Sequence, residues 1–177
     1  MLPKAYAPLE RIFRAMQADP EVFLNVEFHF IGTGKKAVDP GSYNIKPLAE
    51  QYGLWQIKVF EYAQRIPYLD VLVHLACADG IFILGSTEPH YTPSKTYQGV
   101  LSGKPIFAVL HQQSTAVKVL ETAKAGIVLS FDGEKGLGFI EQNFANSFNQ
   151  FRQFAASFQA ESIDKKIFRL VSSLHLY

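Results

Sequence analysis

The sequence predicts an α/β protein with a doubly wound, Rossmann-like parallel sheet of about five strands, helices on both faces and a helical C-terminal tail. Short apolar runs bounded by glycine, at residues 81–84 and 106–110, have the length and composition of buried parallel strands. Between such runs lie segments whose apolar residues recur at helical spacing. Strand and helix therefore alternate along the chain, which is typical of a parallel sheet with crossover helices.

The first half of the chain is predicted to form helix, strand, short helix, brief strand and helix at residues 7–17, 22–31, 47–52, 57–60 and 69–78. The first strand stops at a glycine turn, Gly32 to Gly34, and open α/β sheets bind ligands at such carboxyl ends. The last helix, LDVLVHLACA, is strongly apolar, so we expect it to be buried on most sides. Within it, His74 is expected to be a hydrogen-bonded core histidine and Cys77 a small buried hydrophobe.

The second half continues the alternation, with helices at residues 93–101 and 115–124 and strands at 106–110 and 126–131. From Gly138 onwards we expect helix to the end of the chain. Two apolar stripes at helical spacing support this prediction: Ile140, Phe144, Phe148 and Phe151, followed by Ile163, Ile167, Leu170 and Leu174. Stripes of this kind are packing surfaces.

Length and composition restrict the class of protein. A chain of 177 residues can bury one core, so we expect a single domain over residues 1–177. A formal net charge of +1 argues against nucleic-acid binding through bulk electrostatics, and one cysteine excludes an internal disulfide. The sequence has no run of about 18 apolar residues and no signal peptide, so we expect a cytoplasmic protein. No metal-ligand spacing occurs, and we expect neither a metal nor a cofactor.

The segment between the two central strands contains the clearest local signal for a ligand. Thr92 suits an N-cap and Pro93 the first position of the following helix. Lys95 then lies in the first turn, where a cation opposes the helix dipole at a cost of about 0.3–1 kcal/mol. A bound anion would reverse that sign, with Ser94 as a hydroxyl donor beside it. The segment therefore suggests a phosphate site, and the alternative is a lysine that points into solvent.

Several segments between Phe28 and Glu134 follow one another in the same order and spacing as the motifs of a known family: FHFIGTG, LAEQYGL, IKVFEYAQRIPYLDVLVHLACADGIFILGS, YTPSKTYQGVLSGKPIFAVL and AGIVLSFDGE. Together they resemble the C-terminal, nucleotide-sugar-binding half of GT-B glycosyltransferases of the group 1 type. The resemblance implies a glycosyltransferase donor domain that binds a UDP- or GDP-linked sugar. The glycosyl group would pass to a hydroxyl acceptor.

The resemblance also implies where the donor binds. It assigns the diphosphate to the loop and helix start that contain Tyr91, Thr92, Ser94 and Lys95, in agreement with the local argument on Lys95. It assigns the base to the turn at Arg65 and Ile66, mainly through the backbone. It makes Gly32 and Gly34 the glycine turn that faces the interdomain cleft. No catalytic residue is assigned.

Two positions depart from the family pattern. His90 and Gln98 stand where the family has two glutamates, which contact the sugar and the ribose. Gln98 can still hydrogen-bond a hydroxyl, whereas Glu88 could substitute at the first position only after the loop rearranges. The loss of both glutamates favours the alternative, a non-catalytic Rossmann- or flavodoxin-like nucleotide-binding or interaction module.

The family resemblance further implies a missing part. The donor half of the family begins with a strand and a loop that carries an arginine and a lysine, and nothing before Ala7 supplies these. The N-terminal acceptor half is absent, so we expect a fragment that transfers no sugar alone and associates weakly with itself through the two apolar stripes. The full enzyme would act at the inner face of the membrane. The expected strand order is 57–60, 22–31, 81–84, 106–110, 126–131.

Overall fold

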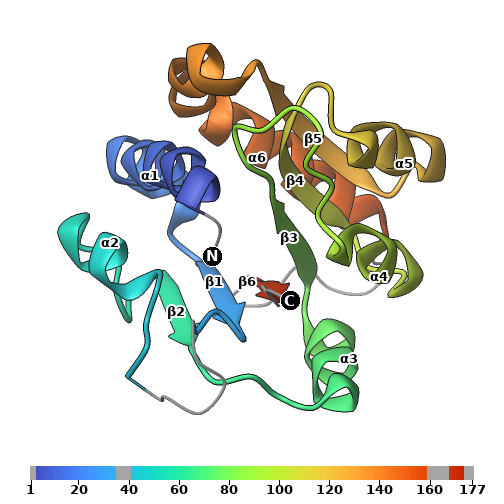
Figure 1. The fold of residues 1–177 in the computed structure, drawn as a ribbon, viewed down its shortest axis with the longest axis horizontal. Helices are drawn as coiled ribbons and strands as arrows, with labels where there is room; N and C mark the ends of the chain where they lie inside the picture. The colour runs from blue at the N-terminus through green and yellow to red at the C-terminus, as the bar shows by residue number, and fades with distance from the viewer. Residues whose placement is uncertain (1–2, 35–40, 159–167, 174–177) are drawn as a thin grey trace.

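Six parallel strands form the sheet at the centre of the computed structural model, which describes residues 3–34, 41–158 and 168–173 (Figure 1). The strands are β1 (Val26–Ile31), β2 (Val59–Tyr62), β3 (Gly80–Leu84), β4 (Ile106–His111), β5 (Gly126–Phe131) and β6 (Phe168–Ser173). Their order across the sheet is β2-β1-β6-β3-β4-β5, and each neighbouring pair is parallel. The predicted fold class, a Rossmann-like parallel sheet, is confirmed, with six strands in place of about five.

Helices cover both faces of this sheet. One face packs against α1 (Pro3–Ala18), α2 (Lys46–Gln51) and α6 (Leu137–Phe158), and the other against α3 (Tyr68–Cys77), α4 (Lys95–Leu101) and α5 (Thr115–Ala123). Two short 3-10 helices complete the described elements, η1 (Pro20–Phe23) and η2 (Gly133–Gly136). The predicted first strand is shorter than expected because Pro20–Phe23 forms η1. Alternation along β3 and β4 sends successive side chains into two separate apolar clusters, one on each face of the sheet.

The phenylalanine stripe of α6 forms the centre of the larger cluster. Phe144, Phe148 and Phe151 are fully buried, and the ring of Phe107 on β4 lies 5.3 to 5.5 Å from all three rings. At Gly80 a Cβ atom would come within 2.8 Å of the Phe151 ring, so glycine there allows α6 to approach β3 closely. The expectation that this stripe mediates self-association is wrong, because the sheet itself covers it.

The C-terminal strand β6 is the largest departure from the sequence prediction, which expected helix from Gly138 to the end. β6 pairs with β1 from Val26↔Phe168 to Ile31↔Ser173 and with β3 at Gly80↔Leu170 and Ile81↔Val171. Leu170 is fully buried. Of the second predicted stripe, only Leu170 lies within the described residues, and it belongs to a strand. The sequence pattern misled because the spacing from Ile163 to Leu170 fits a helix, while Phe168 and Leu170 also alternate as a strand requires.

The position of β6 also changes the expected strand order. The prediction placed the Val26 strand beside the Ile81 strand, whereas β6 lies between β1 and β3. If β6 is counted as the first strand, the order becomes 3-2-1-4-5-6, the doubly wound order of dinucleotide-binding folds. The strand order therefore reverses between β6 and β3, and this is where such sheets bind ligands at their carboxyl ends.

Candidate functional site

The residues predicted to bind the donor lie at one edge of the sheet. Gly32 and Gly34 follow β1, Arg65 and Ile66 follow β2, and the segment from His90 precedes α4 after β3. Because all strands are parallel, these segments leave the sheet at the same, carboxyl edge. They are spread along it, since three strand spacings separate β2 from β3, or about 14 Å.

The segment that follows β3 is anchored to the start of α1. Pro8 lies inside α1 and has no N–H to bond the carbonyl of Lys4 four residues earlier. The backbone N–H of Thr87 donates to that carbonyl instead, at 3.1 Å. The Lys4 ammonium also lies 2.6 Å from the Glu88 carboxylate, although this ion pair is largely exposed. Pro8 therefore leaves a free acceptor that fixes the β3 loop against the first helix.

The other end of the same loop is anchored to the start of α5. The Ser114 hydroxyl, which also caps α5, donates to the carbonyl of Tyr91 at 2.8 Å. The hydroxyls of Thr92 and Thr115 lie 2.6 Å apart. Burial raises the pKa of the Tyr91 hydroxyl above its ordinary value. The loop that carries the predicted diphosphate residues is thus held between α1 and α5.

Helix α4 begins at Lys95, two residues later than predicted. Thr92 is not its N-cap, because the Thr92 hydroxyl bonds Thr115; Ser94 takes that position without a capping hydrogen bond. Lys95 is partly buried, and this burial lowers the pKa of its ammonium group below the ordinary value. Among the described residues, no carboxylate or carbonyl pairs with that ammonium group. Lys95 is therefore a partly desolvated cation that lacks a counter-charge in the described structure.

His90 and Gln98, which replace the family's glutamates, differ in their surroundings. His90 is exposed in the loop before α4. The side-chain oxygen Oε1 of Gln98 is buried and finds no hydrogen-bond partner in the described structure. A ligand hydroxyl could reach this oxygen only after the amide turns outward, so in the present conformation Gln98 does not offer the expected ribose contact.

The glycine turn after β1 serves the fold. Gly32 has a φ of 75°, which favours glycine, and its N–H donates to the Tyr62 carbonyl at 2.8 Å. The N–H of Gly34 donates to the carbonyl of Ala63, also at 2.8 Å. These two N–H groups join the ends of β1 and β2 and are therefore already satisfied. The expected contact of this turn with a ligand would have to come from other atoms.

Glu61 is a structural anion that the sequence analysis missed. Its carboxylate accepts backbone hydrogen bonds from Asn44, Ile45 and Lys46 at 2.8 to 2.9 Å, at the start of α2. It also accepts a hydrogen bond from the buried hydroxyl of Thr33. Several N–H donors and the helix dipole stabilise a carboxylate at this place. Glu61 therefore links β2, α2 and the glycine turn.

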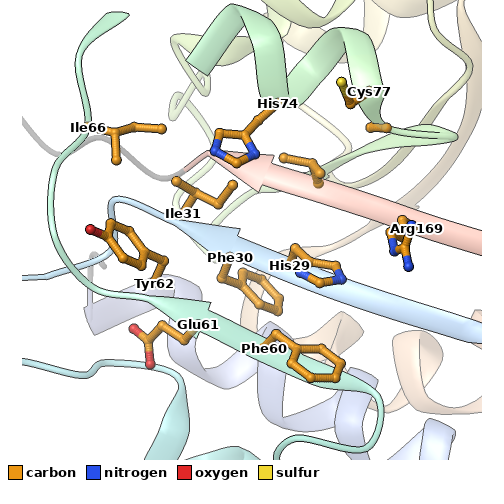
Figure 2. Close-up of a pocket in the computed structure, with 12 residues that line it drawn as sticks. His29, Phe30, Ile31, Phe60, Glu61, Tyr62, Ile66, His74, Cys77 and Arg169 are labelled. Carbon is orange, nitrogen blue, oxygen red and sulfur yellow. The ribbon is translucent and has the colours of Figure 1, made fainter. Parts of the chain in front are cut away.

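A separate cavity of about 600 Å³ lies under α3, against the faces of β1, β2 and β6 (Figure 2). Figure 2 shows His74 pointing from α3 toward the sheet, with Ile66 and Tyr62 at the same end of the cavity. His29 and Arg169 lie together at the other end. The volume falls within the range of small-molecule sites, about 300–1,000 Å³. Of the residues predicted to bind the donor, only Ile66 lines this groove.

The floor of this groove contains an aromatic pair and a small charged cluster. The rings of His29 and Phe60 are stacked, with centroids 4.9 Å apart and planes at 9°. One oxygen of Glu27 accepts from the Arg169 Nε at 3.3 Å and lies 2.9 Å from His29 Nε2. The sequence indicated that the side of β1 facing the groove is not covered, because the polar residues Glu27 and His29 alternate with the buried Phe28 along this strand.

Helix α3 is not buried on most sides, contrary to the prediction. Only Val71 and Leu75 are buried, whereas His74 and Cys77 are exposed and line the groove. His74 is therefore not a core histidine, and Cys77 is an exposed thiol. The composition of the helix predicted burial because an apolar segment usually finds cover within its own domain.

Within the described residues, no group of three or more His, Cys, Asp or Glu side chains could hold a metal ion. No helix in the same ranges has the length and apolar character needed to cross a membrane.

Compared with known proteins, the chain matches no family model, no curated protein and no solved structure. The two candidate sites of this protein are therefore the carboxyl edge of the sheet and the groove under α3.

Proposed function

We propose that this protein binds a nucleoside diphosphate, carried as a UDP- or GDP-linked sugar, at the carboxyl edge of its sheet. The observation that supports the proposal is Lys95, a partly buried ammonium group without a counter-charge among the described residues. Desolvation disfavours the charged form of a lysine, and a bound anion offsets that cost. A diphosphate is an anion whose oxygens also accept from hydroxyl groups, and Ser94 lies exposed beside Lys95.

The strand order supports the same location. Lys95 follows β3, which borders the reversal between β6 and β3, and doubly wound sheets bind ligands at such reversals. Anchoring of the β3 loop to α1 through Thr87 and to α5 through Ser114 preorganises this segment. A loop that is already ordered loses less conformational entropy when a ligand binds.

The proposed biological role is donor binding for sugar transfer to a hydroxyl acceptor. This finer proposal derives from the family resemblance of the sequence. His90 and Gln98 in place of the two glutamates, together with the buried Gln98 oxygen, favour the second candidate, a nucleotide-binding module without catalysis. Both candidates share the diphosphate site and differ in whether the sugar is transferred.

Isothermal titration calorimetry with UDP, GDP, uridine and FMN tests the site. Lys95→Ala should weaken UDP or GDP binding by about 10- to 100-fold, because a hydrogen bond to a charged group contributes roughly 1.5–3 kcal/mol. Binding of uridine, which has no phosphate, should barely change. Lys104→Ala is the matched control, since Lys104 is also half-buried but precedes β4 at the opposite edge of the sheet.

Two results would contradict the proposal. The first is equal affinity of the parent and Lys95→Ala for both diphosphates. The second is selective binding of FMN with no binding of UDP or GDP, which would indicate a flavodoxin-like ligand instead.

A further inference from the structure

We propose that the exposed side of α3 and the groove beside it form a two-fold interface between two copies of this chain. The exposed side, called here the α3 ridge, consists of Tyr68, Leu69, Leu72 and Val73. The groove is the cavity of about 600 Å³ between α3 and the faces of β1, β2 and β6 (Figure 2).

The α3 ridge is a contiguous apolar surface. Its exposed fractions are 55% for Tyr68, 72% for Leu69, 39% for Leu72 and 59% for Val73. These residues are neighbours at helical spacing, so their side chains join into one patch. Single exposed apolar residues are ordinary on a protein surface, whereas the largest contiguous apolar patch of a monomer, typically about 300–600 Å², is often an interaction site. The ridge is such a contiguous patch, and the described residues leave it uncovered.

The ridge and the groove are continuous with each other. Val73 on the ridge lies one helical turn from Cys77, which lines the groove. Phe60, Tyr62 and Ile66 contribute apolar surface to the groove. When a raised and a hollow apolar surface lie side by side, the raised surface of each copy can fit into the hollow surface of the other copy. This is the arrangement that a two-fold, self-complementary interface needs.

The available area fits a weak dimer. The exposed half of Tyr68 amounts to about 110 Å², and Leu69, Leu72 and Val73 add roughly 150 Å². In a two-fold contact each ridge covers a similar area of the partner groove, so total burial is on the order of 1,000 Å². That value is near the lower limit for a specific interface, so we expect a weak dimer that dissociates on dilution.

The charges at this surface suit the same contact. Asp70 is the one charged residue of α3 and is exposed beside the ridge. At the groove, Arg169 uses its Nε for Glu27. Its terminal nitrogens have no hydrogen-bond partner in the described part of the chain. Glu61 lines the groove, but its carboxylate is occupied by the N–H groups of α2. The Asp70 carboxylate of one copy can then accept from those terminal nitrogens of the other copy, beside the existing Arg169–Glu27 ion pair.

Sedimentation equilibrium over a concentration series tests the interface on the full chain. We expect the average mass of the parent to rise with concentration from 19.9 kDa toward twice that value. Val73→Glu should weaken the dimer at least tenfold, because it would bury a carboxylate in an apolar groove. Ile57→Glu is the matched control, since Ile57 is 67% exposed but lies before β2 at the opposite edge of the sheet.

Cys77 provides a second measurement because it is the only cysteine and lines the groove. Its reaction with a maleimide should slow as the parent concentration rises and should stay constant for Val73→Glu. Three results would overturn the proposal: a constant mass of 19.9 kDa at all concentrations, equal weakening by Val73→Glu and Ile57→Glu, or an unchanged Cys77 reaction rate while the mass increases. Protection of Cys77 by an added small molecule, without dimer formation by the free protein, would also overturn it.

Discussion

Replacing Leu170 with alanine tests whether the C-terminal strand lies at the centre of the sheet. Leu170 is fully buried, and β6 has β1 on one side and β3 on the other. Its side chain lies close to Gly80, where the Phe151 ring also packs. Truncation of a buried leucine costs about 2–5 kcal/mol, and more when the surroundings cannot close the cavity. Paired strands on both sides limit such closure, so we expect a cost in the upper half of this range.

A loss of this size is large for one domain, because the total free energy of unfolding is typically about 5–15 kcal/mol. Urea unfolding can be followed by the fluorescence of Trp55, the only tryptophan, which packs against the larger core cluster. Leu101→Ala is the matched control: it makes the same chemical change at a side chain that is 86% exposed. We expect its effect to remain within about 0.5 kcal/mol.

The comparison of these two variants can refute the placement of β6. Equal and small losses for Leu170→Ala and Leu101→Ala would mean that residues 168–173 do not form a central strand. A large loss for Leu170→Ala alone, with an unchanged denaturant slope, supports the strand, because the slope reports the surface exposed on unfolding.

Three further predictions concern other parts of the chain. Gln98→Glu should lower the free energy of unfolding by about 1–3 kcal/mol, because a carboxylate would be buried where the amide oxygen already lacks a partner. Gln98→Met, the control, should be nearly neutral. An unchanged urea midpoint for Gln98→Glu would show that this side chain faces solvent. Hydrogen bonds from Tyr52 and Arg14 lower the pKa of Glu10, so the stability they contribute is present above the unfolded-state pKa and is lost as pH falls through the lower folded pKa. Glu10→Gln should therefore narrow the difference in unfolding midpoint between pH 7 and pH 3, and an equal difference in both proteins would contradict this. The purified chain alone should transfer no sugar from UDP- or GDP-sugars to simple acceptors, because acceptor positioning can contribute about 7–11 kcal/mol and the proposed donor site does not supply it; detectable turnover would disprove this.

Local patterns in the sequence were sufficient for most of the fold. The runs at residues 81–84 and 106–110, which lie within β3 and β4, are apolar at every position, as a strand covered on both faces requires. The phenylalanine stripe of α6 recurs at helical spacing, and it packs as a helical core face. Alternation of these elements implied a parallel sheet, and a parallel sheet places the loops after β1, β2 and β3 at one edge.

Other features depended on contacts between residues far apart in the sequence. The spacing of Leu170 from its apolar neighbours fits both a helix and a strand. The segment forms a strand because it pairs with β1 on one side and with β3 on the other. Helix α3 has the composition of a buried helix, yet its exposure depends on what covers it, which composition cannot specify. Likewise Thr92 has the character of an N-cap, but Thr115, 23 residues later, takes its hydroxyl and shifts the start of α4 to Lys95. Periodicity records which face of an element is apolar, whereas the partner of that face is determined only when the whole chain packs.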